Sequence, residues 1–477
     1  MRLVQTEPSY VYVEDFDDDD LNRLIKILTY QDLSAKYVYT QAKNNKWAYL
    51  RNPEWHQHVE NLKSKIKKCA LIEDKQGIKT YSGLIDYIRN NDFEFEYENL
   101  VKYPDRKALP YDLNYVPLKP WDHQTEAVQA LLQHKHAHIE ASTGSGKSVL
   151  IENLIKSTGY NTLVVAPFTN IAEALYEQFV KAFGKKHVGF YGKNKKESEK
   201  RITVGIAAGI ARLEERSELY KILASKEMLV MDECHAYVAN NLQKISLNVG
   251  RNIPVRYSVS ATPERMDGQS LMLIGLIGPK VFYIDFQSLV DRGVLSPLHF
   301  YIYNVQSQSG YGGKNNKKNS QEHCLYNQEI LALAAKIANS RVVDHNEPTL
   351  ILIEEKEQLD YLKPYLTTNY EFAHSGSDVA QQVKDFNAGK FKLMIGTSAV
   401  STGSDLKVTQ NLILLLSGKS SNKFKQALGR ASRISPGKTH AKIFDFHVVN
   451  DQQSSRHFYQ RLNIYKSLSD KISIKDT

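Results

Sequence analysis

The fold of this 477-residue chain is decided by the stretch Ala141-Ser142-Thr143-Gly144-Ser145-Gly146-Lys147-Ser148. Small residues let the backbone amides of such a loop close around phosphate groups, while Lys147 places a cation between them and the Ser148 hydroxyl can ligate Mg²⁺. Residues 136–140 alternate weakly as a strand does, and residues 149–155 have the apolar spacing of a helix whose N-terminus faces the loop. The sequence therefore predicts a strand, a phosphate-binding loop and a helix. An ordinary strand-to-helix turn is the alternative, because Ala141 stands where the first glycine of this pattern usually is.

A second motif follows downstream, where an apolar run ends in Met231-Asp232-Glu233-Cys234-His235. The run predicts a buried parallel strand, and α/β sheets place their ligand sites at the ends of such strands. There Asp232 is suited to hold Mg²⁺ through water, and Glu233 to orient and deprotonate an attacking water. Two solvated acids at a strand end are the alternative, which the phosphate loop upstream disfavours. Together the two motifs predict hydrolysis of a nucleoside triphosphate.

Composition indicates a globular protein and excludes several classes. The 62 Lys and Arg outnumber the 53 Asp and Glu, and this net charge of +9 is consistent with a polyanionic partner. The three cysteines lie far apart without the spacing of a zinc or iron-sulfur site, which predicts free thiols. The N-terminus lacks the apolar core of a signal peptide, and no apolar run is long enough to span a membrane. We therefore expect a cytoplasmic protein that does not enter a membrane.

The first segment, residues 1–115, reads as a small α+β accessory domain. Residues 37–40 and 47–51 predict a β-hairpin. A helix beginning at Glu54 turns a lysine-rich face outward, which either contacts nucleic-acid phosphates or only keeps the helix soluble. The segment is thus a candidate DNA-binding domain.

Strand and helix patterns then alternate twice along the chain. They predict two parallel sheets flanked by helices, in residues 116–294 with the phosphate loop and in residues 295–450 without one. The basic loop at residues 307–320 either contacts DNA or is simply solvated. Residues 451–477 predict a helical tail packed on the second sheet.

Further short motifs follow in a fixed order: Gln124 before the loop, Ser260-Ala261-Thr262, the stretch from Thr397 to Asp405, and Gln426-Ala427-Leu428-Gly429-Arg430-Ala431-Ser432-Arg433. Their order from residue 121 to 445 resembles that of superfamily 2 helicases with a D-E-x-H box. The small N-terminal domain, the stretch Ser288 to Gly293 and the compact size resemble phage recombination helicases of the UvsW type. The resemblance implies an α/β fold of two tandem RecA-like lobes behind the small α+β domain.

The resemblance also implies an ATP site with Mg²⁺ that draws on both lobes. Its residues are expected to be Gln124 at the adenine edge; Thr143, Gly144, Ser145, Gly146, Lys147 and Ser148 at the phosphates and metal; Gly403 and Asp405 at the nucleotide, Asp405 at the ribose; Gln426 at the water; and Arg430 and Arg433 at the transferred phosphoryl group. Two arginines at helical spacing can also form surface ion pairs, which is the alternative for the last two.

Residues that couple the nucleotide to the strand are implied in the same way. His235, Ser260 and Thr262 are expected to relay the nucleotide state, and hydroxyls or amides at Thr169, Thr397 and Ser398 to contact DNA phosphates. A helix cap at Thr169 and a turn at Thr397 are the alternatives. Where relatives often carry Gly-Thr, this chain has Gly205-Ile206, which removes one hydroxyl from the expected strand path.

The sequence as a whole predicts an ATP-dependent DNA helicase or translocase that unwinds or branch-migrates forked DNA and recombination intermediates. An RNA helicase is the nearest alternative, and a motor or DNA-binding subunit of a nuclease or restriction assembly is another. We expect a monomer that meets recombination, repair or replication proteins, in the host cytoplasm if the chain is phage-encoded.

Overall fold

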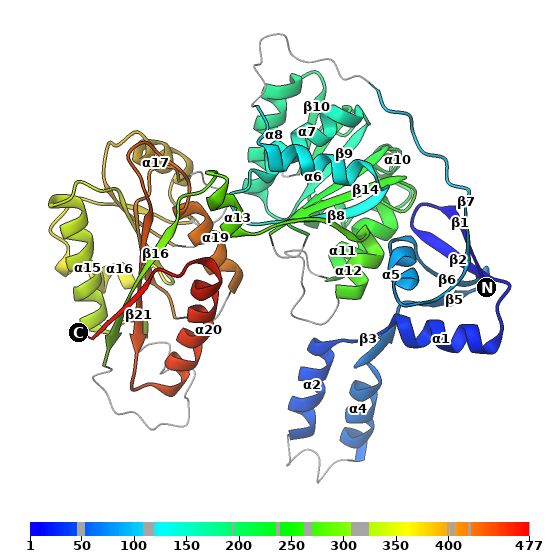
Figure 1. Ribbon diagram of the computed structural model, residues 1–477, viewed down its shortest axis with the longest axis horizontal. Coiled ribbons are helices and arrows are strands. Elements are labelled where there is room, and N and C mark those ends of the chain that lie inside the picture. The colour runs from blue at the N-terminus through cyan, green and yellow to red at the C-terminus, as the bar shows by residue number, and fades with distance from the viewer. Residues whose placement is uncertain are drawn as a thin grey trace. The chain divides into compact units, whose positions relative to one another are not determined.

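The computed structural model describes residues 1–44, 53–107, 119–192, 195–234, 239–261, 270–306, 324–397, 400, 406–417 and 421–476. The chain divides into two compact units (Figure 1). Unit one consists of Met1–Ala141 with Gly146–Tyr283, and unit two of Ser142–Ser145 with Ile284–Thr477. No helix in the described ranges is both long enough and apolar enough to cross a bilayer.

Unit one begins with a five-stranded mixed sheet in the order β5-β6-β2-β1-β7. Strand β1 pairs in parallel with β7 and antiparallel with β2, and the pairs β2–β6 and β5–β6 are antiparallel. The strands are β1 (Arg2–Glu7), β2 (Tyr10–Glu14), β5 (Ile72–Asp74), β6 (Gly77–Tyr81) and β7 (Glu96–Asn99), accompanied by α1 (Asp18–Leu28), a 3₁₀ turn (Ser82–Leu84) and α5 (Ile85–Arg89). The Asp17 carboxylate caps α1 by accepting a hydrogen bond from the Asp20 amide, which explains the acidic run at this helix start.

A helical arm stands where the sequence predicted a β-hairpin. Helices α2 (Leu33–Asn44) and α4 (Pro53–Ser64) lie side by side, joined to the small sheet through the paired strands β3 (Thr29–Gln31) and β4 (Lys67–Cys69) (Figure 1). The prediction of a strand at residues 37–40 is therefore wrong. The Asp32 carboxylate accepts a hydrogen bond from the Ala35 amide at 3.0 Å and so caps a helical first turn. The strand preference of residues 37–40 depends on packing against a sheet, which the arm does not offer; residues 47–51 lie outside the described ranges.

The large sheet of unit one has eight strands in the order β11-β10-β12-β9-β13-β14-β8-β15. Neighbours from β10 to β8 in this order are parallel, and β11 is antiparallel to β10. The strands are β8 (His136–Ala141), β9 (Thr162–Ala166), β10 (Val188–Gly192), β11 (Lys195–Lys196), β12 (Ile202–Ile206), β13 (Met228–Asp232), β14 (Val255–Ser260) and β15 (Lys280–Ile284). The helices are α6 (Asp122–Leu132), α7 (Lys147–Thr158), α8 (Thr169–Phe183), α9 (Ala207–Ile210), α10 (Glu218–Ala224), α11 (Ala239–Lys244), a turn of π-helix (Ile245–Val249) and α12 (Ser270–Ile277). Strands β9 and β13 are buried along their whole length, as expected of parallel strands covered on both faces.

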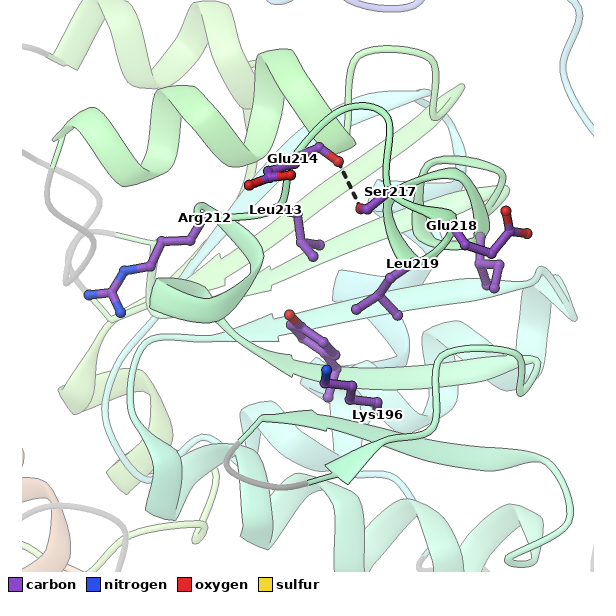
Figure 2. Close-up of a pocket in the computed structure, with 9 residues that line it drawn as sticks. Lys196, Arg212, Leu213, Glu214, Ser217, Glu218 and Leu219 are labelled. Carbon is purple, nitrogen blue, oxygen red and sulfur yellow. Dashed lines mark hydrogen bonds between the residues drawn. The ribbon is translucent and has the colours of Figure 1, made fainter.

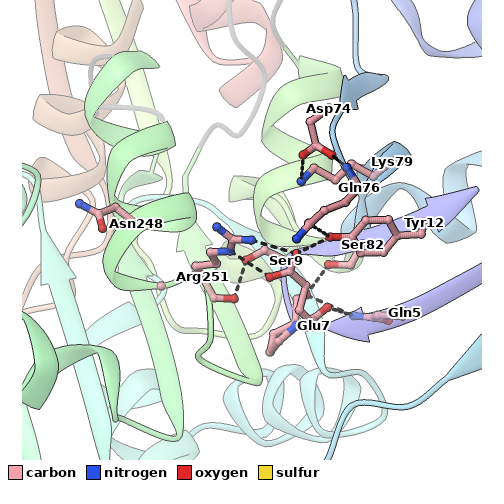
Figure 3. Close-up of polar contacts among 12 residues, drawn as sticks. Gln5, Glu7, Ser9, Tyr12, Asp74, Gln76, Lys79, Ser82, Asn248 and Arg251 are labelled. Carbon is pink, nitrogen blue, oxygen red and sulfur yellow. Dashed lines mark hydrogen bonds and ion pairs between the residues drawn. The ribbon is translucent and has the colours of Figure 1, made fainter. Parts of the chain in front are cut away.

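Polar contacts join the small sheet to the large sheet (Figure 3). The Glu7 carboxylate accepts hydrogen bonds from Arg251 Nε at 2.9 Å and Nη2 at 3.2 Å. Arg256, buried in β14, donates to Ser9 Oγ at 2.8 Å and to the Gly250 carbonyl at 2.9 Å. A single cluster of buried apolar side chains also runs from the small sheet to β13. The small domain therefore packs against the large sheet as part of unit one.

Unit two is built on a seven-stranded sheet, entirely parallel, in the order β18-β19-β17-β20-β21-β16-β22. The strands are β16 (Leu298–Val305), β17 (Thr349–Ile353), β18 (Glu371–Ala373), β19 (Leu393–Gly396), β20 (Asn411–Leu415), β21 (Ala441–Val448) and β22 (Ile472–Asp476). The helices are α13 (Phe286–Asp291), α15 (Gln328–Val343), α16 (Gln358–Leu362) with a 3₁₀ turn (Lys363–Tyr365), α17 (Val379–Asn387), α19 (Ser421–Ala431) and α20 (Gln452–Leu468). The tail thus contributes a helix and, beyond the sequence prediction, the edge strand β22.

Candidate nucleotide-hydrolysis site

The phosphate loop connects β8 to α7, as the sequence predicted. Gly144 and Gly146 have φ of +94° and +75°, a backbone region that side chains rarely adopt. A Cβ on Gly146 would lie 2.3 Å from Gln124 Nε2, so the Gln124 side chain would have to shift. The loop leads directly into the N-terminus of α7, whose unpaired amides and dipole favour an anion. This backbone cradle fits a phosphate chain.

Lys147, the first residue of α7, lies against the acid pair. Its ammonium is 3.0 Å from Glu233 Oε1 and donates to the Ala141 carbonyl at 3.4 Å. The side chains of Lys147 and Glu233 are each 12% exposed, so this ion pair is largely buried. The structure therefore brings together the loop and the strand-end motif, which are distant in sequence.

Asp232 is the last residue of β13 and is buried. Burial, and next the charge of Glu233, raise the pKa of Asp232 to about 7, while Lys147 acts in the opposite direction. Among the residues that the structure describes, Oδ1 of Asp232 has no hydrogen-bond partner. A buried carboxylate oxygen without a protein donor fits a water ligand of Mg²⁺, which protein sites commonly hold through one or two carboxylates and substrate phosphates.

Glu233 is held in place from the neighbouring strand. Its Oε2 accepts hydrogen bonds from the Ala261 amide at 3.2 Å and from Ser260 Oγ at 3.4 Å, at the end of β14. Its own φ is +48°, a left-handed conformation that costs a non-glycine residue about 1–2 kcal/mol. The strained backbone and the fixed carboxylate are typical of a residue positioned for chemistry, and the Ser260 contact links β14 to it.

Gln124 connects the start of α6 to the loop. Its Oε1 accepts from the Trp121 amide at 2.9 Å, and its Nε2 donates to the Gly146 carbonyl at 3.2 Å. The Trp121 ring is 45% exposed and would be 3.1 Å from a Cβ on Gly146. An exposed indole beside the phosphate loop can stack on a base. Sequence reasoning missed this residue, although its position three residues before Gln124 was a usable signal.

The arginine motif lies in unit two, where α19 carries Gln426 and Arg430, and Arg433 follows the helix. Arg430 Nη1 donates to the Val400 carbonyl at 2.9 Å. Burial lowers the pKa of the Arg433 guanidinium. The motif therefore occupies one helix and the turn after it, and its role toward the nucleotide stays a prediction.

Several predicted site residues lie outside the described ranges: His235, Thr262, Ser398, Gly403 and Asp405, together with the loop 307–320. Thr169 is the first residue of α8, and the cap position belongs to Phe168, which makes no side-chain cap. The alternative of a cap at Thr169 is therefore wrong. Thr397 does form a turn, because its carbonyl accepts from the Val400 amide at 3.0 Å. Contacts of Thr169 and Thr397 with DNA remain predictions.

A shallow cavity of about 570 Å³ in unit one is lined by residues that the sequence did not single out (Figure 2). It lies between the β10–β11 hairpin and the segment from Arg212 to Ile222. Two basic side chains, Lys196 and Arg212, and two acidic ones, Glu214 and Glu218, line it. Because these charges balance, the cavity favours no single class of ligand.

Two family matches follow the division of the motifs. Residues 117–265 match the family Type III restriction enzyme, res subunit, and residues 332–435 match the helicase conserved C-terminal domain. The first match contains the phosphate loop and the acid pair, and the second contains both motif arginines. The chain therefore carries both domain types in order and resembles superfamily 2 helicases, as the sequence predicted.

Named relatives agree with this assignment. The chain is 25% identical over 334 residues to helicase 22 of Sulfolobus islandicus filamentous virus (isolate Iceland/Hveragerdi), a match covering 64% of this chain and 59% of the viral protein. It is 22% identical over 407 residues to DNA 3'-5' translocase XPB2 of Sulfurisphaera tokodaii, covering 75% of this chain and 88% of the relative. The chain thus spans less than two thirds of the viral relative's length.

The fold is shared with a solved subunit of a restriction enzyme. A fragment of an HsdR subunit of a type I restriction enzyme from Vibrio vulnificus YJ016 superposes with a TM-score of 0.56 at 17% identity, over 77% of this chain and 69% of that one. T4 UvsW aligns over 100% of this chain and 99% of its own at 15% identity, with a TM-score of 0.44. The prediction of two tandem RecA-like lobes behind a small α+β domain is confirmed.

Proposed function

We propose that the chain is an ATP-dependent DNA helicase or translocase that unwinds or branch-migrates forked DNA and recombination intermediates. The observation that carries the proposal is the buried Asp232 and the partly buried Glu233 at the end of β13, with Lys147 of the phosphate loop 3.0 Å from Glu233. An acid fixed beside a phosphate cradle can activate water against a phosphate chain. The family resemblance favours ATP as the source of that chain.

In the proposed reaction the loop amides and Lys147 bind the phosphates, and Glu233 removes the proton of the attacking water. Ser148 and Asp232 would hold Mg²⁺, which would supply charge neutralisation to the phosphate oxygens. Arg430 and Arg433 stabilise charge on the transferred group, an effect worth about 10³ to 10⁵ in rate for comparable arginines. Gln426 positions the water.

Coupling to movement follows from the origin of these groups on two different sheets. We propose that ATP binding and hydrolysis change the state of these groups in turn, so that each cycle can advance a strand. His235, Ser260 and Thr262 are proposed to relay the nucleotide state, and the contact of Ser260 with Glu233 supports this role.

DNA is the preferred substrate for two reasons. The archaeal relative that covers three quarters of this chain is named a DNA translocase. The helical arm also carries exposed lysines, among them Lys36, Lys43 and Lys65, which suit contact with phosphates without reading sequence. We propose that the arm, together with Thr169, Thr397 and Ser398, contacts the DNA backbone.

A motor subunit of a restriction assembly is the second candidate. The fold shared with the HsdR fragment and the match of residues 117–265 to the restriction-enzyme family favour it. We place this candidate second, because the relative that covers three quarters of this chain is named a DNA translocase.

The decisive experiment measures ATP hydrolysis and strand displacement by the purified chain on a fork, a four-way junction, a tailed duplex and a structured RNA. We expect stimulation and displacement with the branched DNA substrates. Glu233→Gln should bind DNA without turnover, and Glu214→Gln, at the separate cavity, should behave as wild type. Preference for RNA would favour an RNA helicase, and Mg²⁺-dependent DNA cutting would favour the restriction motor.

A further inference from the structure

Lys438 in unit two is a buried cation that the proposed chemistry does not use. It lies in the turn between α19 and β21, and its ammonium donates to three main-chain carbonyls. These belong to Thr409 at 2.7 Å, to Arg433 at 2.8 Å and to Ala431. Within the described part of the chain no carboxylate pairs with it, and burial lowers the pKa of Lys438 to about 7. Burial of a cation without a counter-ion is costly, so the three hydrogen bonds must offset that cost.

The three carbonyls come from segments that converge on the arginine motif. Ala431 is the last residue of α19, where carbonyls lack helical partners and the dipole favours a cation. Arg433 follows two residues later. Thr409 precedes β20, so that Lys438 connects the end of the motif helix to the start of a central strand.

Main-chain contacts also hold the turn after α19, which carries Arg433. The Ser296 amide donates to the Ser432 carbonyl at 2.6 Å, and Leu295 pairs with Arg433 in an isolated bridge. These contacts hold the turn on the side where the chain enters unit two. Lys438 reaches the turn, the helix end and the segment before β20 together.

We propose that Lys438 is a positioning residue for Arg433: by gathering the carbonyls of Thr409, Ala431 and Arg433 it fixes the backbone from which the guanidinium projects. The inference rests on the proposed role of Arg433 in ATP hydrolysis. A misplacement of about 1 Å at a catalytic group can cost about 10²-fold in rate, so loss of the ammonium should lower turnover without altering ATP binding.

The test compares Lys438→Met, Arg433→Met and the double variant in steady-state ATP hydrolysis with saturating forked DNA. We expect Arg433→Met to lower kcat about 10³-fold or more and Lys438→Met to lower it about 10- to 100-fold, with KM for ATP within about threefold. The double variant should be no slower than Arg433→Met, because Lys438 acts through that residue. Lys442→Met, which removes a lysine of β21 paired with Glu347, is the matched control and should keep the wild-type kcat.

Each outcome separates the inference from the function on which it rests. Wild-type kcat in folded Lys438→Met, or a double variant whose loss is the product of both single losses, would overturn the positioning role. Wild-type kcat in Arg433→Met would instead overturn the arginine assignment itself. If Lys438→Met does not fold, Lys438→Gln, which is shorter and uncharged, decides: reduced kcat at unchanged KM supports the role, and wild-type kcat with unchanged KM refutes it.

Discussion

Each lobe buries an aspartate in a parallel strand, and the two aspartates differ in their hydrogen-bond partners. Asp445 of β21 is fully satisfied: Arg461 Nε and Nη2 donate to it at 2.9 and 3.1 Å, Tyr465 Oη at 2.8 Å and the Phe446 amide at 2.8 Å. Asp232 of β13 is as buried, but its Oδ1 has no partner among the described residues.

The difference separates a structural carboxylate from one that we propose to be functional. A buried charge with a complete set of donors holds elements together, here α20 against β21. A buried carboxylate with an oxygen left unpaired lowers stability and persists where a ligand completes it. The same residue type thus serves packing in the lobe without a phosphate loop and, in our proposal, chemistry in the lobe that has one.

The largest expected effect is on catalysis. Asp232→Asn should reduce kcat for ATP hydrolysis by about 10³-fold or more, because the amide removes the charge that holds Mg²⁺. Asp445→Asn should leave kcat per folded molecule within about threefold. Steady-state ATP hydrolysis, normalised to folded protein by circular dichroism, measures both, and equal losses in the two variants would remove the distinction.

The next effect is on stability, where Asp445→Asn should lose more than Asp232→Asn. Asp445→Asn leaves Arg461 buried without its counter-ion, so we expect the free energy of unfolding to fall by about 3–5 kcal/mol. Urea denaturation followed by circular dichroism measures it. Asp385→Asn, at an exposed ion pair with Lys390, is the control and should leave the urea midpoint nearly unchanged. A midpoint for Asp445→Asn close to that of the control would show that the buried pair contributes little.

The pH dependence of stability tests the burial of Asp232. Its folded pKa, about 7, lies above the unfolded value of 3.8, so the folded state keeps a proton that the unfolded chain releases. The stability that the protonated Asp232 carboxyl contributes is therefore fully present below pH 4 and is lost as the pH rises toward and through 7. In Mg²⁺-free buffer Asp232→Asn should be more stable than wild type at pH 8, on the order of 1–4 kcal/mol, and this difference should shrink toward pH 5. A variant less stable than wild type at pH 8 would contradict the assignment.

The smallest expected effect concerns one donor to Asp445. Tyr465→Phe removes the hydroxyl but keeps the ring, which stacks on Phe300 with centroids 4.4 Å apart. We expect a loss of about 0.5–1.5 kcal/mol in the free energy of unfolding, since Arg461 still satisfies the carboxylate. Tyr459→Phe on the same helix, 57% exposed, provides the comparison in the same urea titration. A loss as large as that of Asp445→Asn would mean that the hydroxyl, rather than the ion pair, holds the network.

Local signals accounted for the catalytic half of the candidate site. The glycines of the loop, Lys147 and the acid pair could be read from the sequence, because phosphate binding requires these residue types at short, fixed spacing. Strands β17 and β19 are apolar runs, a local pattern of the kind from which the alternation was predicted. The strand predicted at residues 37–40 failed because the cap at Asp32 started a helix that strand preference alone does not reveal.

The sequence by itself determined the alternation of strands and helices, the phosphate loop and the acids that follow β13, because periodicity and short motifs are local properties of a chain. Only the tertiary structure decided which charges are paired. The donors to Asp445 come from a helix 16 and 20 residues away, and Lys438 collects a carbonyl 29 residues distant. Partners of this kind depend on how elements pack in three dimensions, and that packing separates the aspartate that holds the fold from the one proposed to hold the metal.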